Sequence, residues 1–147
     1  MTKKFYMTPG SCSTGIHILL EECGLVFEAH IVNLLAGDQY KKEYLAINPK
    51  GSIPALVLDD GSSLTEFSAI AWWLARTYPK RKLLPESIAG EVRVLGIMNY
   101  AVHTLHTQGF ARIFTTERFS PSSSDHESVK AQGRQIIDQG FAIINRE

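Results

Sequence analysis

The chain has 147 residues and equal numbers of basic and acidic side chains, 15 of each, so its formal net charge is zero. This length allows a buried core in one domain or two small ones. The balanced charge gives no basic excess for nucleic acid, and no apolar run is long enough to cross a membrane, so we expect neither partner. The two cysteines and the lack of a signal-peptide core are typical of a cytoplasmic protein.

The first part of the chain predicts a β-α-β unit. Residues 4–8 alternate loosely and predict a short strand, which a Pro-Gly pair ends. A helix then begins near Ser11 or Ser13, both good N-caps, and Gly24 ends it. Residues 26–34 predict a second strand, which we expect to be parallel to the first through a right-handed connection.

A loop containing two breakers leads into a third strand. Pro49 and Gly51 prevent a regular element before residue 53, and the apolar run 55–58 is typical of a buried strand. Pro54 lacks an N–H, so it belongs at the first position of that strand or at a bend. We expect the Ile53–Pro54 peptide bond to be cis, with the backbone of Ile53 free to pair with an extended peptide. The alternative is a rigid turn without a ligand.

The remaining residues complete this domain and predict a helical one. A weak helix is predicted over residues 38–47, and a turn over residues 59–61 should join the third strand to a return strand at 63–65. Residues 66–78 predict a helix ended by a proline. We therefore predict an N-terminal domain over residues 1–79.

The rest of the chain shows no strand pattern. Residues 80–90 are charged and irregular and predict a linker, followed by an all-helical domain over 91–147. Its first helix should extend from Glu91 to about Thr116, and Gly109 is expected to bend it. The last helix starts near residue 126, and its apolar face is predicted to consist of Ile137, Phe141 and Ile144.

Four motifs together resemble the glutathione S-transferases, most closely the bacterial beta class. They are YMTPGSCS at 6–13, NPKGSIPAL at 48–56, LTEFSAI at 64–70, and Met98-Asn99-Tyr100 with His106. The resemblance implies an α/β thioredoxin-like domain that binds glutathione, an all-α domain that supplies the electrophile pocket, and a homodimer. The family's helical domain runs well past residue 147, so we expect this one to be incomplete.

Cys12 is the candidate sulfur group. At the start of a helix, free N–H groups and the helix dipole stabilise a thiolate, whereas burial raises a thiol pKa, and the sequence leaves the outcome open. We predict a partly ionised thiol that contacts the sulfur of glutathione; the alternative is a small packing residue. Because position 15 is glycine, a resolving cysteine is missing and dithiol exchange is not expected.

The resemblance implies the remaining site residues. The predicted catalytic residues are Cys12, Ser13 and His106, and the predicted glutathione contacts are Ser11, Ser52, Ile53, Pro54, Glu66, Phe67 and Asn99. This chain departs from the family pattern at Met7, Phe67 and Thr107. His103 and His106 share a helical face, but nothing supplies a third ligand, so no metal is expected.

These residues predict an enzyme of detoxification that conjugates glutathione, its co-substrate, to small electrophiles without a further cofactor. Exchange of a glutathione disulfide with Cys12 is a variant of this prediction. The alternative is a non-catalytic binding or interaction protein with the same fold. Glutathione-dependent isomerisation ranks last, because the arginine-bearing motif of that class is absent after Cys12.

Overall fold

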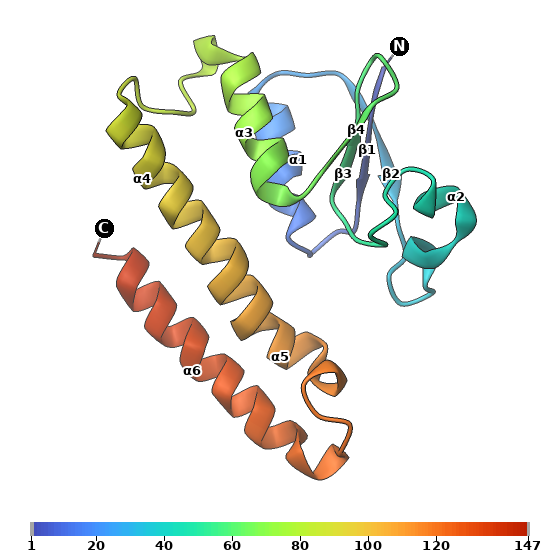
Figure 1. The fold of residues 1–147 in the computed structure, drawn as a ribbon, viewed down its shortest axis with the longest axis vertical. Coiled ribbons are helices and arrows are strands. Elements are labelled where there is room, and N and C mark those ends of the chain that lie inside the picture. The colour runs from blue at the N-terminus through green and yellow to red at the C-terminus, as the bar shows by residue number, and fades with distance from the viewer. Residues whose placement is uncertain (1, 147) are drawn as a thin grey trace. The chain divides into compact units, whose positions relative to one another are not determined.

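The computed structural model describes residues 2–146, which divide into two compact units between residues 85 and 86. The first unit is a sheet with helices and the second is entirely helical (Figure 1). Among the described residues no helix combines the length and the apolar character that a membrane crossing requires.

The first unit is built on a four-stranded mixed sheet. Its strands are β1 (Lys3–Met7), β2 (Phe27–Ile31), β3 (Ala55–Val57) and β4 (Ser63–Thr65), in the spatial order β2-β1-β3-β4. β1 pairs with β2 in parallel, whereas β1 with β3 and β3 with β4 are antiparallel. The predicted β-α-β start and the later hairpin are both confirmed, and the fold class is thioredoxin-like as expected.

Two helices pack side by side against this sheet. They are α1 (Ser13–Glu22) and α3 (Phe67–Thr77), and the short α2 (Lys42–Leu45) lies on the other side (Figure 1). Phe5 of β1 and Leu56 of β3 are register partners, and both are fully buried with Ile16 of α1. This apolar layer fixes α1 on the sheet and so places the first turn of α1 beside the carboxyl end of β1.

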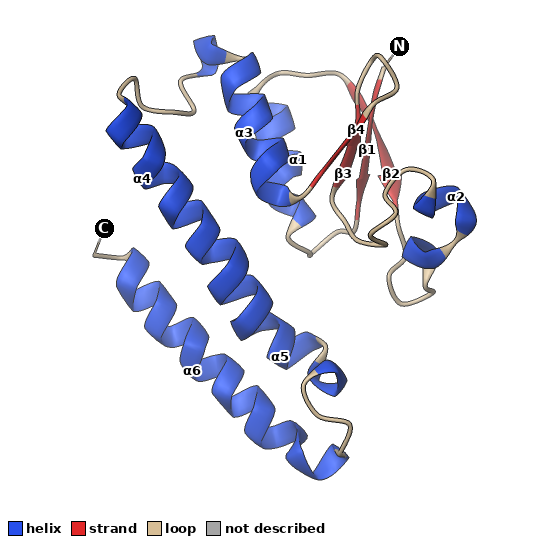
Figure 2. Ribbon diagram, in the orientation of Figure 1, coloured by secondary structure: helices blue, strands red, loops and turns tan. Residues whose placement is uncertain are grey.

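The helical unit consists of two long helical segments that lie alongside each other (Figure 2). The first comprises α4 (Ile88–Asn99), a π-helical segment (Tyr100–Phe110) and α5 (Ala111–Phe114), and the second is α6 (His126–Ile144). The continuous helix is as predicted. Its wider central segment is not, because sequence periodicity over eleven residues does not distinguish α- from π-helical hydrogen bonding.

The buried face of α6 differs from the predicted one. Val129, Gly133, Ile137 and Gly140 are buried, whereas Phe141 is 54% exposed. The three residues of the predicted apolar face therefore differ in burial: Ile137 is buried, whereas Phe141 is exposed. The buried positions include two glycines, which a search for large apolar side chains overlooks.

These glycines bring the two helical segments into backbone contact. A Cβ at Gly133 would lie 2.8 Å from the carbonyl oxygen of Gly109, and one at Gly140 would lie 1.9 Å from Cδ2 of Leu105. Helices that meet through backbone atoms cannot accept even one added methyl group without moving apart. The contact between the π-helical segment and α6 thus depends on the absence of side chains.

We expect Gly133→Ala to lower the free energy of unfolding by about 1–3 kcal/mol, because its methyl group overlaps a backbone oxygen that cannot rotate away. Gly96→Ala in α4 is the matched control, since no atom lies within 4 Å of its added Cβ. It should stabilise the protein by about 0.5–1 kcal/mol through helix propensity. Urea unfolding followed by circular dichroism measures both, and a gain in stability for both variants would contradict the close packing.

Candidate functional site

The first turn of α1 carries Cys12 between two serines. Cys12 is the N-cap residue and is half-buried, whereas Ser13 is fully buried. The Thr8 N–H donates to Ser13 Oγ at 3.1 Å, and the Thr8 carbonyl oxygen lies 2.7 Å from Ser11 Oγ and 3.1 Å from Ser13 Oγ. The two hydroxyl oxygens are themselves 2.7 Å apart.

This serine arrangement leaves no hydroxyl proton for a ligand. Two hydroxyl groups have two protons, and one goes to the Thr8 carbonyl while the other lies between the serines. Either serine would have to break one of these bonds to donate elsewhere. As placed here, Ser11 and Ser13 hold the loop before α1 rather than opening their hydroxyls to a sulfur.

Cys12 faces the loop that enters β3. Its Sγ lies 3.9 Å from the carbonyl oxygen of Ile53, and the Ile53–Pro54 peptide bond is cis as predicted. Burial raises the pKa of the Cys12 thiol, outweighing the backbone N–H groups of Cys12 and Ser13 that lower it. This direction is opposite to the one that the predicted partial ionisation near neutral pH requires, because desolvation exceeds the effect of the helix start.

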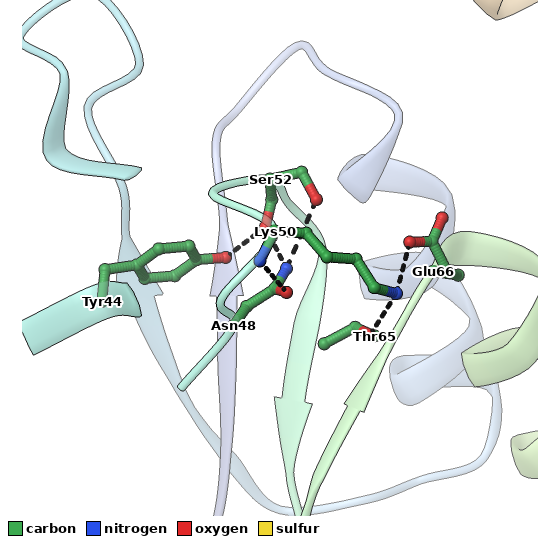
Figure 3. A network of polar contacts seen from close by, with 6 residues as sticks. All are labelled: Tyr44, Asn48, Lys50, Ser52, Thr65 and Glu66. Carbon is green, nitrogen blue, oxygen red and sulfur yellow. Dashed lines mark hydrogen bonds and ion pairs between the residues drawn. The ribbon is translucent and has the colours of Figure 1, made fainter. Parts of the chain in front are cut away.

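A buried asparagine shapes the loop opposite Cys12 (Figure 3). Asn48 is fully buried; its Nδ2 donates to the Ser52 carbonyl oxygen at 2.6 Å, and its Oδ1 accepts from the Lys50 N–H at 3.2 Å. The Tyr44 hydroxyl donates to the same carbonyl oxygen at 2.6 Å. Because a trans peptide is planar, these two donors also aim the Ile53 N–H in the opposite direction.

The loop is connected to the start of α3 by a lysine. Lys50 Nζ lies 2.7 Å from Glu66 Oε1 and 2.9 Å from Thr65 Oγ1, so the side chain spans from the loop to the end of β4 (Figure 3). Glu66 is the N-cap of α3 and has φ 75° and ψ 130°. A residue with a Cβ rarely adopts a positive φ, and such strain clusters at ligand-binding positions.

Phe67 begins α3, and its side chain turns toward α1. A Cβ at Gly15 would lie 2.8 Å from Cε2 of the Phe67 ring, so the ring occupies the space that a side chain at position 15 would need. Gly15 lies one helical turn after Cys12. The position of the Phe67 ring thus depends on the absence of a side chain at position 15.

Asn99 and His106 belong to the helical unit. Asn99 is the last residue of α4, and its carbonyl oxygen lies 3.1 Å from Nδ1 of His103. His106 lies on the exposed side of the π-helical segment, where partial desolvation lowers its pKa. No group of three His, Cys, Asp or Glu residues in the described part of the chain could hold a metal ion.

A helix start that carries a cysteine, facing a cis-proline loop on a thioredoxin-like sheet, defines a class of thiol and glutathione-binding domains. A family model, the N-terminal domain of glutathione S-transferases, matches residues 10–77. Glutathione S-transferase GstA of Escherichia coli O157:H7 is 39% identical over 128 residues, 81% of this chain and 61% of the relative. This chain belongs to the glutathione S-transferase family.

Solved structures agree with this assignment. A glutathione transferase homologue from Sulfitobacter with bound glutathione has a TM-score of 0.89 and 31% identity, over 97% of this chain and 68% of that one. A beta-class glutathione S-transferase from Sphingomonas chungbukensis has a TM-score of 0.79 and 29% identity, with the same coverage. The chain spans about three fifths of the length of the curated relatives it matches.

Sequence reasoning missed the residues that shape the site. Asn48, Lys50 and Tyr44 were not among the predicted site residues, although Asn48 and Lys50 lie in a motif that carried the family resemblance. A polar residue next to breakers was a usable signal for Asn48, because such residues satisfy loop backbone groups. Nothing in the sequence indicated that Tyr44, in a weak helix, reaches the same carbonyl.

We expect Asn48→Ala to lower the free energy of unfolding by about 1–3 kcal/mol, because it removes a donor from the Ser52 carbonyl and leaves the Lys50 N–H without its acceptor. Asn33→Ala is the matched control, since Asn33 is exposed and its side chain accepts from the Ala36 N–H. It should change stability by at most about 0.5–1 kcal/mol. Urea unfolding measures both variants. Equal losses of unfolding free energy would contradict the prediction that the buried Asn48 hydrogen bonds stabilise the fold more than the exposed Asn33 hydrogen bond does.

Because burial raises the pKa of Cys12, iodoacetamide should alkylate it at pH 7 more slowly than it alkylates cysteine in an unfolded peptide, and the rate should rise with pH. The raised pKa also affects folding stability. As pH rises, the Cys12 thiol ionises in the unfolded chain before it ionises in the folded one, so the free energy of unfolding falls above the ordinary thiol pKa of about 8.5. Cys12→Ser should reduce this alkaline loss. Mass spectrometry of the labelled peptide measures the rate, and faster labelling of Cys12 than of the peptide at pH 7 would contradict the prediction.

Proposed function

We propose that this protein is a glutathione transferase that conjugates reduced glutathione to small alkyl or aryl electrophiles. The observation that carries the proposal is the approach of Cys12 Sγ, at the first turn of α1, to the Ile53 carbonyl oxygen at 3.9 Å. A glutathione sulfur bound there would meet the Cys12 thiol at the start of α1. The anchored Ser52 peptide would direct the Ile53 N–H to the cysteinyl backbone of glutathione.

The γ-glutamyl end of glutathione would bind at the start of α3. The positive end of the helix dipole suits its carboxylate, through the backbone N–H of Phe67, and Glu66 suits its ammonium group. Ser11, Ser52 and Pro54 would shape the same cleft. The proposed roles of Asn99 and His106 rest on the resemblance to the beta class.

The chemistry is a displacement at an electrophilic carbon. The glutathione thiol loses its proton to solvent, its sulfur forms a bond to the carbon, and the leaving group departs with the electron pair of the broken bond. A neutral Cys12 keeps its proton and can donate a hydrogen bond through it to the glutathione thiolate. Its raised pKa therefore favours conjugation over disulfide exchange through Cys12, which needs the Cys12 thiolate. Glutathione is the co-substrate, and no other cofactor is required.

The proposal extends to assembly and cellular role. Ile88 and Val92 lie one turn apart on α4 and are 80% and 61% exposed, which supports a homodimer that covers this face. A glutathione-dependent enzyme of this kind would act in the cytoplasm, where glutathione keeps thiols reduced. Conjugation of electrophiles to glutathione would make this protein an enzyme of detoxification.

A non-catalytic glutathione-binding protein is the second candidate, favoured by the Phe67 ring on α1. This ring replaces the small residue that many family members have after the acid. Because both candidates use the same cleft, fold alone does not separate them.

Titration calorimetry with reduced glutathione, followed by a turnover assay with an aryl halide, tests the proposal. We expect binding and turnover, and a Cys12→Ala variant that binds glutathione but turns over about ten to a hundred times more slowly, since it loses a donor to the thiolate. Cys23→Ala is the matched control, because Cys23 is a buried cysteine at the other end of α1. Binding without turnover would select the binding protein, and absence of binding would remove both candidates.

A further inference from the structure

Lys50 is the one residue of the Asn48–Ser52 loop that Figure 3 draws reaching across to the start of α3. Its backbone N–H is held by the buried Asn48, and its Nζ contacts both Thr65 and Glu66. The backbone of Lys50 is therefore fixed by a buried side chain, and its ammonium group contacts a carboxylate at the start of α3, where the backbone is strained. Both ends of this contact belong to segments that would bind glutathione.

The Lys50–Glu66 pair adds little to folding stability. Its two side chains are 51% and 61% exposed, and water and salt screen an ion pair of that kind. Thr65 is an additional neutral partner for the lysine. A contact with such small value for the fold, made to a residue with positive φ, points to a role in the site.

The negative charge of Glu66 disfavours the formation of a sulfur anion in the proposed site. The Phe67 ring beside Gly15 brings the start of α3 next to the first turn of α1, where Cys12 lies. A carboxylate there disfavours any sulfur anion: after burial, the charge of Glu66 also acts to raise the pKa of Cys12. His17 lies further along α1, where it pairs with Glu21 at 3.5 Å and its ring lies against Phe5 and Phe27.

We propose that Lys50 is a positioning residue of this site, which holds the Glu66 carboxylate at the start of α3 and compensates its charge so that a sulfur anion can form beside the first turn of α1. The part of this inference that concerns the glutathione sulfur rests on the proposed function. The glutamate remains available to the ammonium group of glutathione through its second oxygen. Its field at the sulfur is reduced because the lysine charge lies 2.7 Å from its first oxygen.

The test measures Cys12 alkylation by iodoacetamide as a function of pH, without glutathione, in four single variants, one double variant and the parent protein. Lys50→Met removes the charge and keeps the stem, Lys50→Arg restores the charge, and Glu66→Gln removes the opposing carboxylate. Lys41→Met is the matched control, since Lys41 forms an exposed pair with Asp38 at the same 2.7 Å distance. Circular dichroism verifies that each variant is folded.

We expect Lys50→Met to slow Cys12 labelling at pH 7 about twofold to fourfold, and Glu66→Gln to accelerate it by a similar factor, as partly screened charges do. Lys50→Arg and Lys41→Met should match the parent protein. In the Glu66→Gln background, Lys50→Met should have a smaller effect, because its target charge is gone. The Lys50→Met effect should also shrink at about 1 M salt.

Equal labelling of Lys50→Met and Lys41→Met would overturn the inference, whatever the protein does with glutathione. With glutathione and an aryl halide, the acidic limb of the kcat/KM profile should move to higher pH in Lys50→Met and return in Lys50→Arg. If no variant binds glutathione, the proposed function fails, while the alkylation series still decides the role of Lys50. A change in KM without a change in the pH profile would reduce Lys50 to a binding contact and contradict charge compensation.

Discussion

The candidate site depends on the orientation of one peptide group. Two side-chain donors, from Tyr44 and Asn48, anchor the Ser52 carbonyl oxygen at 2.6 Å each. Because the peptide is planar, the Ile53 N–H must then point away from these two donors, while the Ile53 carbonyl oxygen lies 3.9 Å from Cys12 Sγ. Asn48 is fully buried, so breaking these bonds would leave polar groups without water, and the loop therefore has one conformation.

The second feature of the site is the set of hydrogen-bond donors that the first turn of α1 can offer to a sulfur atom. Ser11 and Ser13 use their hydroxyl protons within the loop before α1, and the N–H groups of Ser13, Thr14 and Gly15 also donate within this turn, which leaves the Cys12 thiol as a donor for a sulfur. Burial keeps that thiol protonated. A neutral donor beside a bound thiolate avoids like-charge repulsion, and that arrangement suits conjugation better than exchange.

The helical unit shows a different use of small residues. Gly109, Gly133 and Gly140 have no role in chemistry, but they let the π-helical segment and α6 approach to backbone contact. The less favourable hydrogen-bond geometry of a π-helical segment is offset where neighbouring side chains pack closely against it. Here Leu105 and Ile137 fill the space that the glycines leave. Packing between helices, not local propensity, decides this geometry.

The sequence by itself determined the thioredoxin-like order of elements, the hairpin after Pro54 and the family. Each of these depends on local signals, such as proline and glycine breakers, apolar runs and motifs of adjacent residues. Only the tertiary structure decided that burial raises the pKa of Cys12, that Phe67 lies on Gly15, that Phe141 is exposed and that Lys50 meets Glu66. Desolvation and contacts between residues far apart in the chain exist only once the elements have packed, so no local pattern encodes them.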